Sequence, residues 1–175
     1  MLSSLKQDFF AQDAEIVARE LLGKILVRKE NGKEKRAKIV ETEAYYGPED
    51  PASRACKNGD LKNTMESNAG TILVYGVHNN WLINFVTGTK GKAEAVLIRA
   101  LEPLNFNEKC SGPGLLTKAL NINKNFHNKT IGNELYILDN PEKVEIIESF
   151  RIGIKKDLPK KLRFYIKDSK FVSRR

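Results

Sequence analysis

The sequence has few of the residues from which membrane segments, disulfide frameworks and metal centres are built. No apolar run approaches the ~20 residues that span a bilayer, so contact with a membrane is not expected. The two cysteines, Cys56 and Cys110, are too few and too far apart for a disulfide framework or a CxxC motif. With His78 and His127 they are the only soft ligands, and their spacing fits no zinc pattern. We therefore expect no metal and no cofactor.

Targeting segments and repeats are missing as well. The first residues, MLSSLKQDFFAQDAEI, lack the charged start, the continuous apolar stretch and the small-residue cleavage site of a secretory signal. The chain has 175 residues with no repeat, no low-complexity segment and no internal linker. These features predict one domain, residues 1–175, in a reducing cytoplasm.

Positive charge, in contrast, is abundant and concentrated at one end. Residues 155–175 carry nine Lys/Arg and two Asp, a net +7 out of +8 for the whole chain. Such a segment, with Phe164, Tyr165 and Phe171 among its cations, is suited to neutralising nucleic-acid phosphates, with its rings in the core or on a base. The alternative is a solvated edge strand whose lysines discourage aggregation. The charge pattern alone leaves both open.

Periodicity and turn residues predict an α+β fold with a largely antiparallel sheet. Asp13 is a candidate helix N-cap with Gly23 as the stop, and 112–122 reads as a second helix. Apolar and β-branched runs predict strands at 24–29, 36–46, 71–77, 81–88, 95–101, 135–138, 144–154 and 162–167.

Two hairpins and one long loop are expected between these elements. Asn31-Gly32 is a strong two-residue hairpin signal, and His78-Asn79-Asn80 marks a second hairpin tip. The segment from Gly47 to Gly70 is far longer than usual connections, and loops of that length are usually functional or mobile.

The stretch IVETEAYY, residues 39–46, places acids and rings on an otherwise apolar strand. Alternation puts Glu41, Glu43 and Tyr45 on one face, with the carboxyl-bearing residues ~6.6 Å apart. Paired carboxylates beside a ring suit chemistry at a glycosidic carbon, where one acid orients water and the ring holds a planar leaving group. The alternative is a pair of solvent-facing glutamates opposite cations of the hairpin: Arg28, Arg36 or Lys38.

Five segments, in the same order, resemble the alkyladenine (3-methyladenine) DNA glycosylase family: VETEAYYGPEDPAS, GTILVYGVHNNWLIN, LIRALEPL, CSGPGLLTKALNI and LRFYIKDSKFVS. The resemblance covers nearly the whole chain, from Ala18 to Val172. It implies a single compact domain with a curved sheet, flanking helices and a protruding β-hairpin. It also implies a monofunctional enzyme of base excision repair, which flips alkylated or deaminated purines out of double-stranded DNA and hydrolyses the N-glycosidic bond.

The same resemblance implies a monomer that leaves an abasic site and works without a cofactor. Its place would be the cytoplasm, at the nucleoid, in a prokaryote, and the nucleus in a eukaryote. Glu43 matches the general base, Arg99 an arginine that helps hold the attacking water, and Ile152 the residue whose backbone carbonyl also holds it. For Arg99, a buried ion pair is the structural alternative.

The pocket for the base is assigned in the same way. Tyr45 matches the ring that stacks on the flipped base, and Tyr75 a second aromatic wall. Asn84 matches an asparagine that clashes with the exocyclic amine of guanine. For Tyr75, a ring of the core is the structural alternative.

Three positions depart from the family pattern. Arg54 stands where relatives often have a histidine that bonds the lesion, and arginine offers only donors, which leaves the base preference open. His78, beside Asn79, falls where the family presents a tyrosine wedge, although another gapping aligns Tyr75 there. Leu73 replaces a frequent pocket tyrosine, which makes the pocket more apolar.

Two other functions stay open at this point. A non-catalytic nucleic-acid-binding protein of the same fold would account for Arg54 and His78, but it needs none of Glu43, Tyr45 and Arg99. A glycosylase with a lyase step through a lysine Schiff base is compatible with the many lysines, although the resemblance speaks against it.

Overall fold

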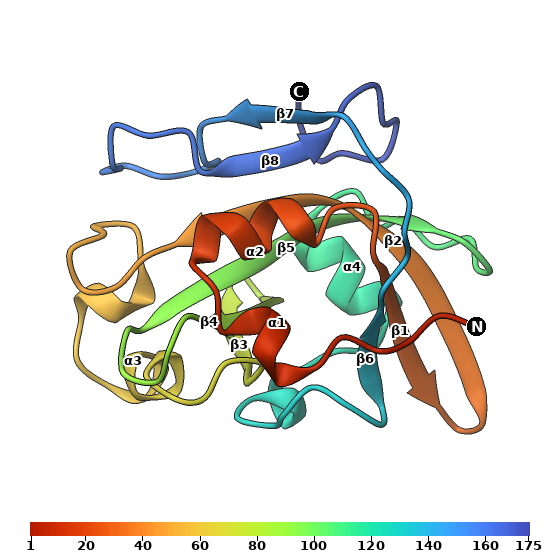
Figure 1. Ribbon diagram of the computed structural model, residues 1–175, viewed down its shortest axis with the longest axis horizontal. Coiled ribbons are helices and arrows are strands. Elements are labelled where there is room, and N and C mark those ends of the chain that lie inside the picture. Colours follow the sequence, from red (N-terminus) through yellow and green to blue (C-terminus); the bar gives the residue numbers. More distant parts are fainter.

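Eight strands form one sheet in the computed structural model, which describes residues 1–175 (Figure 1). The strands are β1 (Ile25–Glu30), β2 (Lys33–Tyr45), β3 (Ile72–Val77), β4 (Asn80–Thr87), β5 (Glu94–Pro103), β6 (Leu135–Leu138), β7 (Ile146–Ser149) and β8 (Arg163–Ile166). The helices are α1 (Gln7–Phe10), α2 (Ala14–Glu20), α3 (Asp60–Met65) and α4 (Pro113–Ala119), with 3-10 turns η1 (Arg54–Cys56) and η2 (Lys124–Phe126).

The long strand β2 is the centre of this sheet. The main strand order is β3-β4-β5-β2-β1-β6, and every pairing is antiparallel. The first half of β2 pairs with β1, while residues 41–43 pair with β8, which in turn pairs with β7. The predicted α+β class with a curved, largely antiparallel sheet and flanking helices is confirmed.

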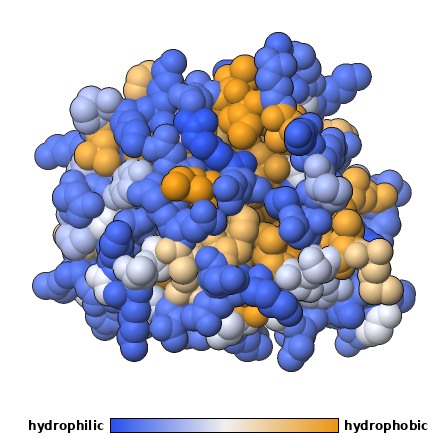
Figure 2. Space-filling model, viewed as in Figure 1, coloured by the Kyte–Doolittle hydropathy of each residue, from blue (hydrophilic) through white to orange (hydrophobic).

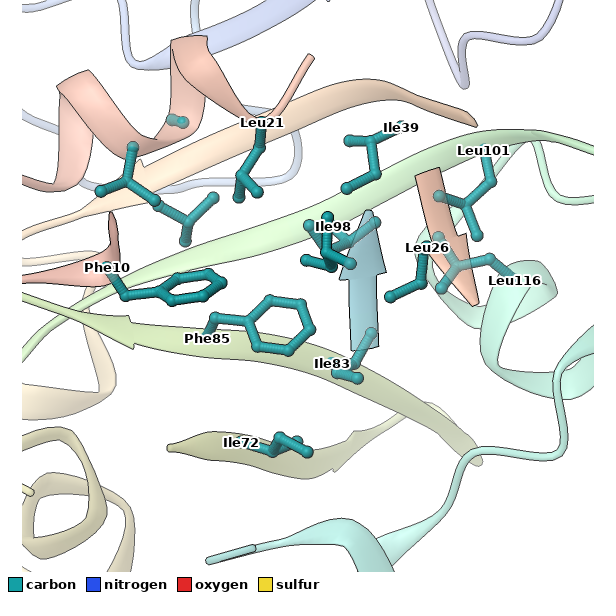
Figure 3. Packing of buried hydrophobic residues seen from close by; sticks show 14 of the residues in the cluster. Phe10, Leu21, Leu26, Ile39, Ile72, Ile83, Phe85, Ile98, Leu101 and Leu116 are labelled. Atoms are coloured by element: carbon teal, nitrogen blue, oxygen red, sulfur yellow. The ribbon is translucent and has the colours of Figure 1, made fainter. Parts of the chain in front are cut away.

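The core lies between the sheet and the helices on one of its faces. Phe10 of α1 and Phe85 of β4 meet at 5.6 Å between ring centroids, and both are fully buried (Figure 3). Helix α2 begins where Asp13 accepts a hydrogen bond from the Glu15 N–H and stops before Gly23, whose φ is 88°. The predicted cap and stop of this helix are confirmed.

Both predicted hairpins are present. Asn31 and Gly32 have φ of 50° and 73°, and His78 and Asn79 have φ of 49° and 63°, the left-handed conformations that two-residue hairpin turns require. Asn80 is the first residue of β4 rather than part of the turn. Asparagine tolerates this backbone conformation better than most side chains, which is why the local sequence was sufficient to predict the turns.

Three sequence-based expectations are wrong in detail. The segment from Gly47 to Gly70 contains η1 and α3 instead of one irregular loop. The strand expected at 144–154 is limited to β7, because the chain turns away after Ser149. The edge-strand alternative for the basic segment is also wrong: β8 lies between β2 and β7, and its Phe164 is 0 % exposed beneath Arg19.

Hydrophilic residues predominate on the face shown in Figure 2, with smaller hydrophobic groups between them. None of the helices combines the length and the apolar character that crossing a membrane requires. His, Cys, Asp and Glu side chains nowhere gather in a group of three or more that could hold a metal ion.

Candidate active site

The second half of β2 has a core face and a buried polar face. Thr42 donates its hydroxyl to a backbone carbonyl of α2 at 2.7 Å, and Ala44 belongs to the main hydrophobic cluster. Glu41, Glu43 and Tyr45 alternate with them, as predicted. Both carboxylates are 0 % exposed, so the alternative of two solvent-facing glutamates is wrong.

A double irregularity in the ladder directs Arg99 between the two acids. Along β2 and β5 the register passes from Ile39↔Leu101 to Glu41↔Ala100 and then to Thr42↔Ile98, so Val40 and Arg99 have no partner across the ladder. Such bulges re-aim side chains. The Arg99 Nε atom lies 3.2 Å from Oε1 of Glu41, and its Nη1 lies 3.3 Å from Oε1 of Glu43.

Glu43 accepts three hydrogen bonds. Its donors are Nη1 of Arg99, the Tyr45 hydroxyl at 2.9 Å and the backbone N–H of Ile152 at 2.7 Å. Burial raises the pKa of Glu43 above its ordinary value, and these three donors limit the rise. A carboxyl group with a raised pKa in a buried polar cluster is a typical catalytic acid or base. Ile152 is therefore at the predicted site, although the contact seen is made by its N–H.

Glu41 is more fully bonded than Glu43. Its two oxygens accept from Nε of Arg99, Nη1 of Arg163 at 3.3 Å, and both the backbone N–H and the hydroxyl of Ser173 at 2.6 and 2.8 Å. Oε1 of Glu41 accepts three of these four bonds and Oε2 accepts one, and two of the donors are arginines. Arg163 and Ser173 were missed by the sequence analysis, although both lie in the quoted segment LRFYIKDSKFVS.

Tyr45 is fixed from two sides. Its hydroxyl bonds Glu43, and the guanidinium carbon of Arg151 lies 4.5 Å from the centre of its ring. Arg151 is itself held by Asp50, with Nη1 and Nη2 at 2.7 and 2.8 Å from the two carboxylate oxygens, and by Asp157. Burial raises the pKa of Tyr45 well above its ordinary value, and Glu43 raises it further, so the hydroxyl stays a donor. Arg151, next to Ile152, was also missed.

Tyr75, Asn84 and Arg54 form a second group next to the first. The guanidinium carbon of Arg54 lies over the ring of Tyr75, 4.6 Å from its centre, and Arg54 takes part in no ion pair. Asn84 is 2 % exposed, and its amide donates to the backbone carbonyl of Leu73 at 3.3 Å. Burial raises the pKa of Tyr75, and the charge of Glu43 adds to this rise, so the two groups are within electrostatic reach. Tyr75 also packs against a small cluster that contains Leu73.

His78 and Asn79 lie apart from this cluster, at the exposed tip of the β3–β4 hairpin. The hairpin rests on α4: the Thr117 hydroxyl donates to the backbone carbonyl of Trp81 at 2.7 Å. Gly114 allows this approach, because a Cβ added there would lie 2.7 Å from Cγ of Asn80. The tip is thus supported on one side and open on the other.

The sequence matches a known protein family over most of its length. Residues 8–170 match the family model described as Methylpurine-DNA glycosylase (MPG). The chain belongs to this family. The resemblance seen in the five sequence segments is confirmed, and membership makes the protein a DNA glycosylase, a hydrolase of N-glycosyl bonds with DNA as its substrate.

Relatives of this glycosylase match it along nearly its whole length. Proteins of Aeropyrum pernix, Borrelia garinii subsp. bavariensis and Legionella pneumophila are 41%, 45% and 40% identical to it. The matches cover 97%, 95% and 99% of this chain, and 93%, 98% and 100% of the relatives. All three carry the name "Putative 3-methyladenine DNA glycosylase".

Proposed function

We propose that this glycosylase extrudes alkylated and deaminated purines from double-stranded DNA and hydrolyses their N-glycosidic bond with Glu43 as the general base. The observation that carries the proposal is the difference in bonding between the two acids. Glu41 accepts four hydrogen bonds, two of them from arginines, whereas Glu43 accepts three, only one of them from an arginine, and its pKa is raised by burial. Glu43 is therefore less neutralised by arginines than Glu41 and better able to take a proton from a water molecule.

In the proposed reaction a water molecule attacks C1′ of the deoxyribose while the bond from C1′ to the purine nitrogen breaks. The electron pair of that bond leaves with the base, and positive charge develops on the sugar. Glu43 accepts the proton of the water, and its charge stabilises the sugar cation. A purine alkylated on a ring nitrogen already carries a positive charge, so it leaves as a neutral base, whereas a neutral purine such as hypoxanthine leaves as an anion and takes up a proton from solvent. The products are the free base and an abasic site.

Arg99 and Ile152 complete the proposed water site. Arg99 holds the carboxylate of Glu43 through Nη1, and Ile152 holds its other oxygen through the backbone N–H. These contacts leave Glu43 little freedom to rotate, which is the condition for orienting a water molecule. We expect the Ile152 carbonyl to accept the second hydrogen of that water.

The extruded base would lie between the rings of Tyr45 and Tyr75. An extruded purine exposes two π-faces, and stacking on aromatic rings holds any purine regardless of its substituents. Asn84 would exclude guanine, because its side-chain amide would clash with the exocyclic amine of that base. Arg54, over Tyr75, would contact the edge of the base and adjust which lesions are preferred.

His78 and Asn79 would fill the space that the base leaves in the duplex. Both are exposed at the tip of a two-residue turn, where a probe of the minor groove has to project. The exposed cations of residues 155–175 would bind the neighbouring phosphates. We propose that the protein binds DNA in this way as a monomer.

The proposal is tested with duplexes that carry one hypoxanthine, ethenoadenine or 3-methyladenine, incubated with excess protein and then cleaved with alkali. Strand cleavage that depends on Glu43 supports it. Binding of these duplexes without any abasic product would favour the non-catalytic alternative.

A lyase step is tested separately with borohydride. The side chains that bond Glu43 and Arg99 include no lysine that could form a Schiff base at the reacting carbon. We therefore expect no trapped protein–DNA adduct. A covalent adduct in borohydride would contradict the monofunctional assignment.

A further inference from the structure

The contacts around Glu41 extend the proposed catalytic group to the last residues of the sequence. We propose that Ser173 is a positioning residue: it holds Glu41, and Glu41 holds Arg99 against the general base Glu43. This inference depends on the proposed function, because it explains how the proposed base is kept in place.

Ser173 bonds both oxygens of Glu41. The backbone N–H donates to Oε2 at 2.6 Å, and the hydroxyl donates to Oε1 at 2.8 Å. The same hydroxyl oxygen lies 3.5 Å from Nη2 of Arg99. Glu41 is 0 % exposed, so loss of these bonds leaves a buried carboxylate with fewer donors.

The segment that carries Ser173 has no regular secondary structure, and polar contacts hold it in place. Arg163 donates from Nη1 to the backbone carbonyl of Arg174 at 2.8 Å while it also bonds Glu41. Within the segment, the Phe171 N–H donates to Oγ of Ser169 at 3.2 Å. Phe171 itself is 37 % exposed, so its ring adds little burial. The segment is therefore anchored mainly at Glu41.

Arg99 divides its hydrogen bonds between the two acids. Three donors share Oε1 of Glu41: Arg99 Nε, Arg163 Nη1 and the Ser173 hydroxyl. If the hydroxyl is removed, this buried oxygen loses its shortest bond, and the Arg99 guanidinium that also bonds it is drawn closer. Movement of Arg99 toward Glu41 is movement away from Glu43.

Loss of the Ser173 hydroxyl should raise the pKa of Glu43. Its charge is affected by Arg99 of β5, by Glu41 and Tyr45 of β2, and by Tyr75 of β3. Arg163 of β8, the register partner of Glu43, also faces this carboxylate. Among these, Arg99 favours the ionised form most, so a retreat of Arg99 raises the pKa of Glu43. Less base is then ionised at a given pH.

The test compares the full-length Ser173→Ala and Ser173→Thr variants with the unchanged protein. We expect Ser173→Ala to slow single-turnover excision of hypoxanthine roughly tenfold, the effect of losing one hydrogen bond to a charged group. The acid limb of the pH profile should move to higher pH, while the dissociation constant for the lesion duplex stays the same. Ser173→Thr keeps the hydroxyl and should restore both rate and limb.

Ser169→Ala is the matched control. It removes a hydroxyl from the same segment, and Ser169 does not contact Glu41. If Ser169→Ala slows excision as much as Ser173→Ala, and neither shifts the acid limb, then the segment is only a structural support and the inference is wrong. An unchanged rate and limb in Ser173→Ala would overturn it as well.

Failure of the proposed function can be separated from failure of this inference. The ionisation of Glu43 is followed without any substrate, through the side-chain carboxyl resonances of protein labelled with 13C-glutamate. A rise of the Glu43 midpoint in Ser173→Ala supports the positioning role even if the unchanged protein excises no lesion. A midpoint that stays in place contradicts the role whatever the activity.

Discussion

The hydroxyl of Tyr45 donates to Oε1 of Glu43 at 2.9 Å, two residues away on the same face of β2. The ring proposed to stack on the extruded purine is thus joined by a hydrogen bond to the proposed general base, Glu43. This bond is one of the contacts that lower the pKa of Glu43 against the effect of burial.

Tyr45→Phe keeps the ring and removes this donor. The pKa of Glu43 should rise further above its ordinary value, so the acid limb of single-turnover excision should move to higher pH. Lesion binding should change little, because the stacking surface remains. The matched control is Tyr46→Phe, since the Tyr46 hydroxyl bonds Asp13 at 3.1 Å, outside the cluster. An acid limb that shifts equally in both variants would argue against a direct effect on Glu43.

Glu43→Gln should cut single-turnover excision by roughly 100-fold or more, the usual contribution of a positioned general base. The amide cannot accept a proton or carry the charge, and the variant should lose the acid limb altogether. Lesion binding, measured by fluorescence anisotropy, should stay near that of the unchanged protein.

Glu41→Gln is the companion variant. It should lower the melting temperature, because Arg99 and Arg163 would lose a buried anion, while it slows excision far less than Glu43→Gln does. If Glu41→Gln abolishes excision and Glu43→Gln remains active, the assignment of the base is reversed.

Arg54 should select against lesions that are cations. Its guanidinium lies over Tyr75 without a carboxylate partner, and a base stacked nearby with its own positive charge would be repelled. Arg54→Gln should increase the rate ratio of 3-methyladenine to hypoxanthine on the order of tenfold. Arg54→Lys keeps the charge and should leave this ratio unchanged, and Arg54→His should also alter the ratios among lesions. Ratios that stay constant in all three variants would make Arg54 a structural residue.

The support of the hairpin tip by α4 can be tested at Gly114. In Gly114→Ala the new Cβ would lie 2.7 Å from Cγ of Asn80, which displaces the tip that carries His78. Excision of a well-paired lesion should fall roughly tenfold, and excision of a mismatched lesion, which is easier to extrude, should fall less. His78→Ala should show the same preference.

Gly112→Ala is the control for the hairpin, because a Cβ there makes only ordinary contact with Leu115 at 3.5 Å. Adding Asn80→Gly to Gly114→Ala removes the clashing side chain and should restore excision. Equal losses on paired and mismatched substrates in His78→Ala would assign the wedge to Asn79 or Tyr75.

The two adjacent lysines of the basic segment should differ in their effect on DNA binding. Lys160 pairs with Glu15 at 2.5 Å, whereas Lys161 is exposed and forms no ion pair. Lys161→Ala should weaken binding to all duplexes alike and reduce the slope of log K against log salt by about one. Lys160→Ala should reduce it less. A slope unchanged in both variants would mean that this part of the surface does not touch phosphate.

Local signals in the sequence were sufficient for much of the fold. The turns at Asn31-Gly32 and His78-Asn79 depend on residues that accept positive φ, so they could be predicted from the dipeptides alone. The shared face of Glu41, Glu43 and Tyr45 follows from alternation along one strand.

The rest of the site depends on pairings between distant parts of the chain. Arg151 and Asp50 are 101 positions apart, and Ser173 and Glu41 are 132 apart. No periodicity links such residues, and the bulge that re-aims Arg99 appears only once β2 and β5 are paired. The exposed-hairpin alternative for the two acids was wrong for the same reason: the cations that neutralise them come from β5 and β8.

The two register irregularities between β2 and β5 also restrict where residues can be inserted or deleted. Deletion of Thr42, for example, would make Glu41 and Glu43 sequence neighbours on opposite faces of the strand, because side chains alternate with a period of two. The extra residue of β2 is matched by one in β5, so the two strands can lengthen or shorten only together. Insertions at the Asn31-Gly32 tip leave this phase untouched. Inherited insertions and deletions should therefore accumulate at that tip, while the half of β2 that carries Glu43 changes by substitution alone.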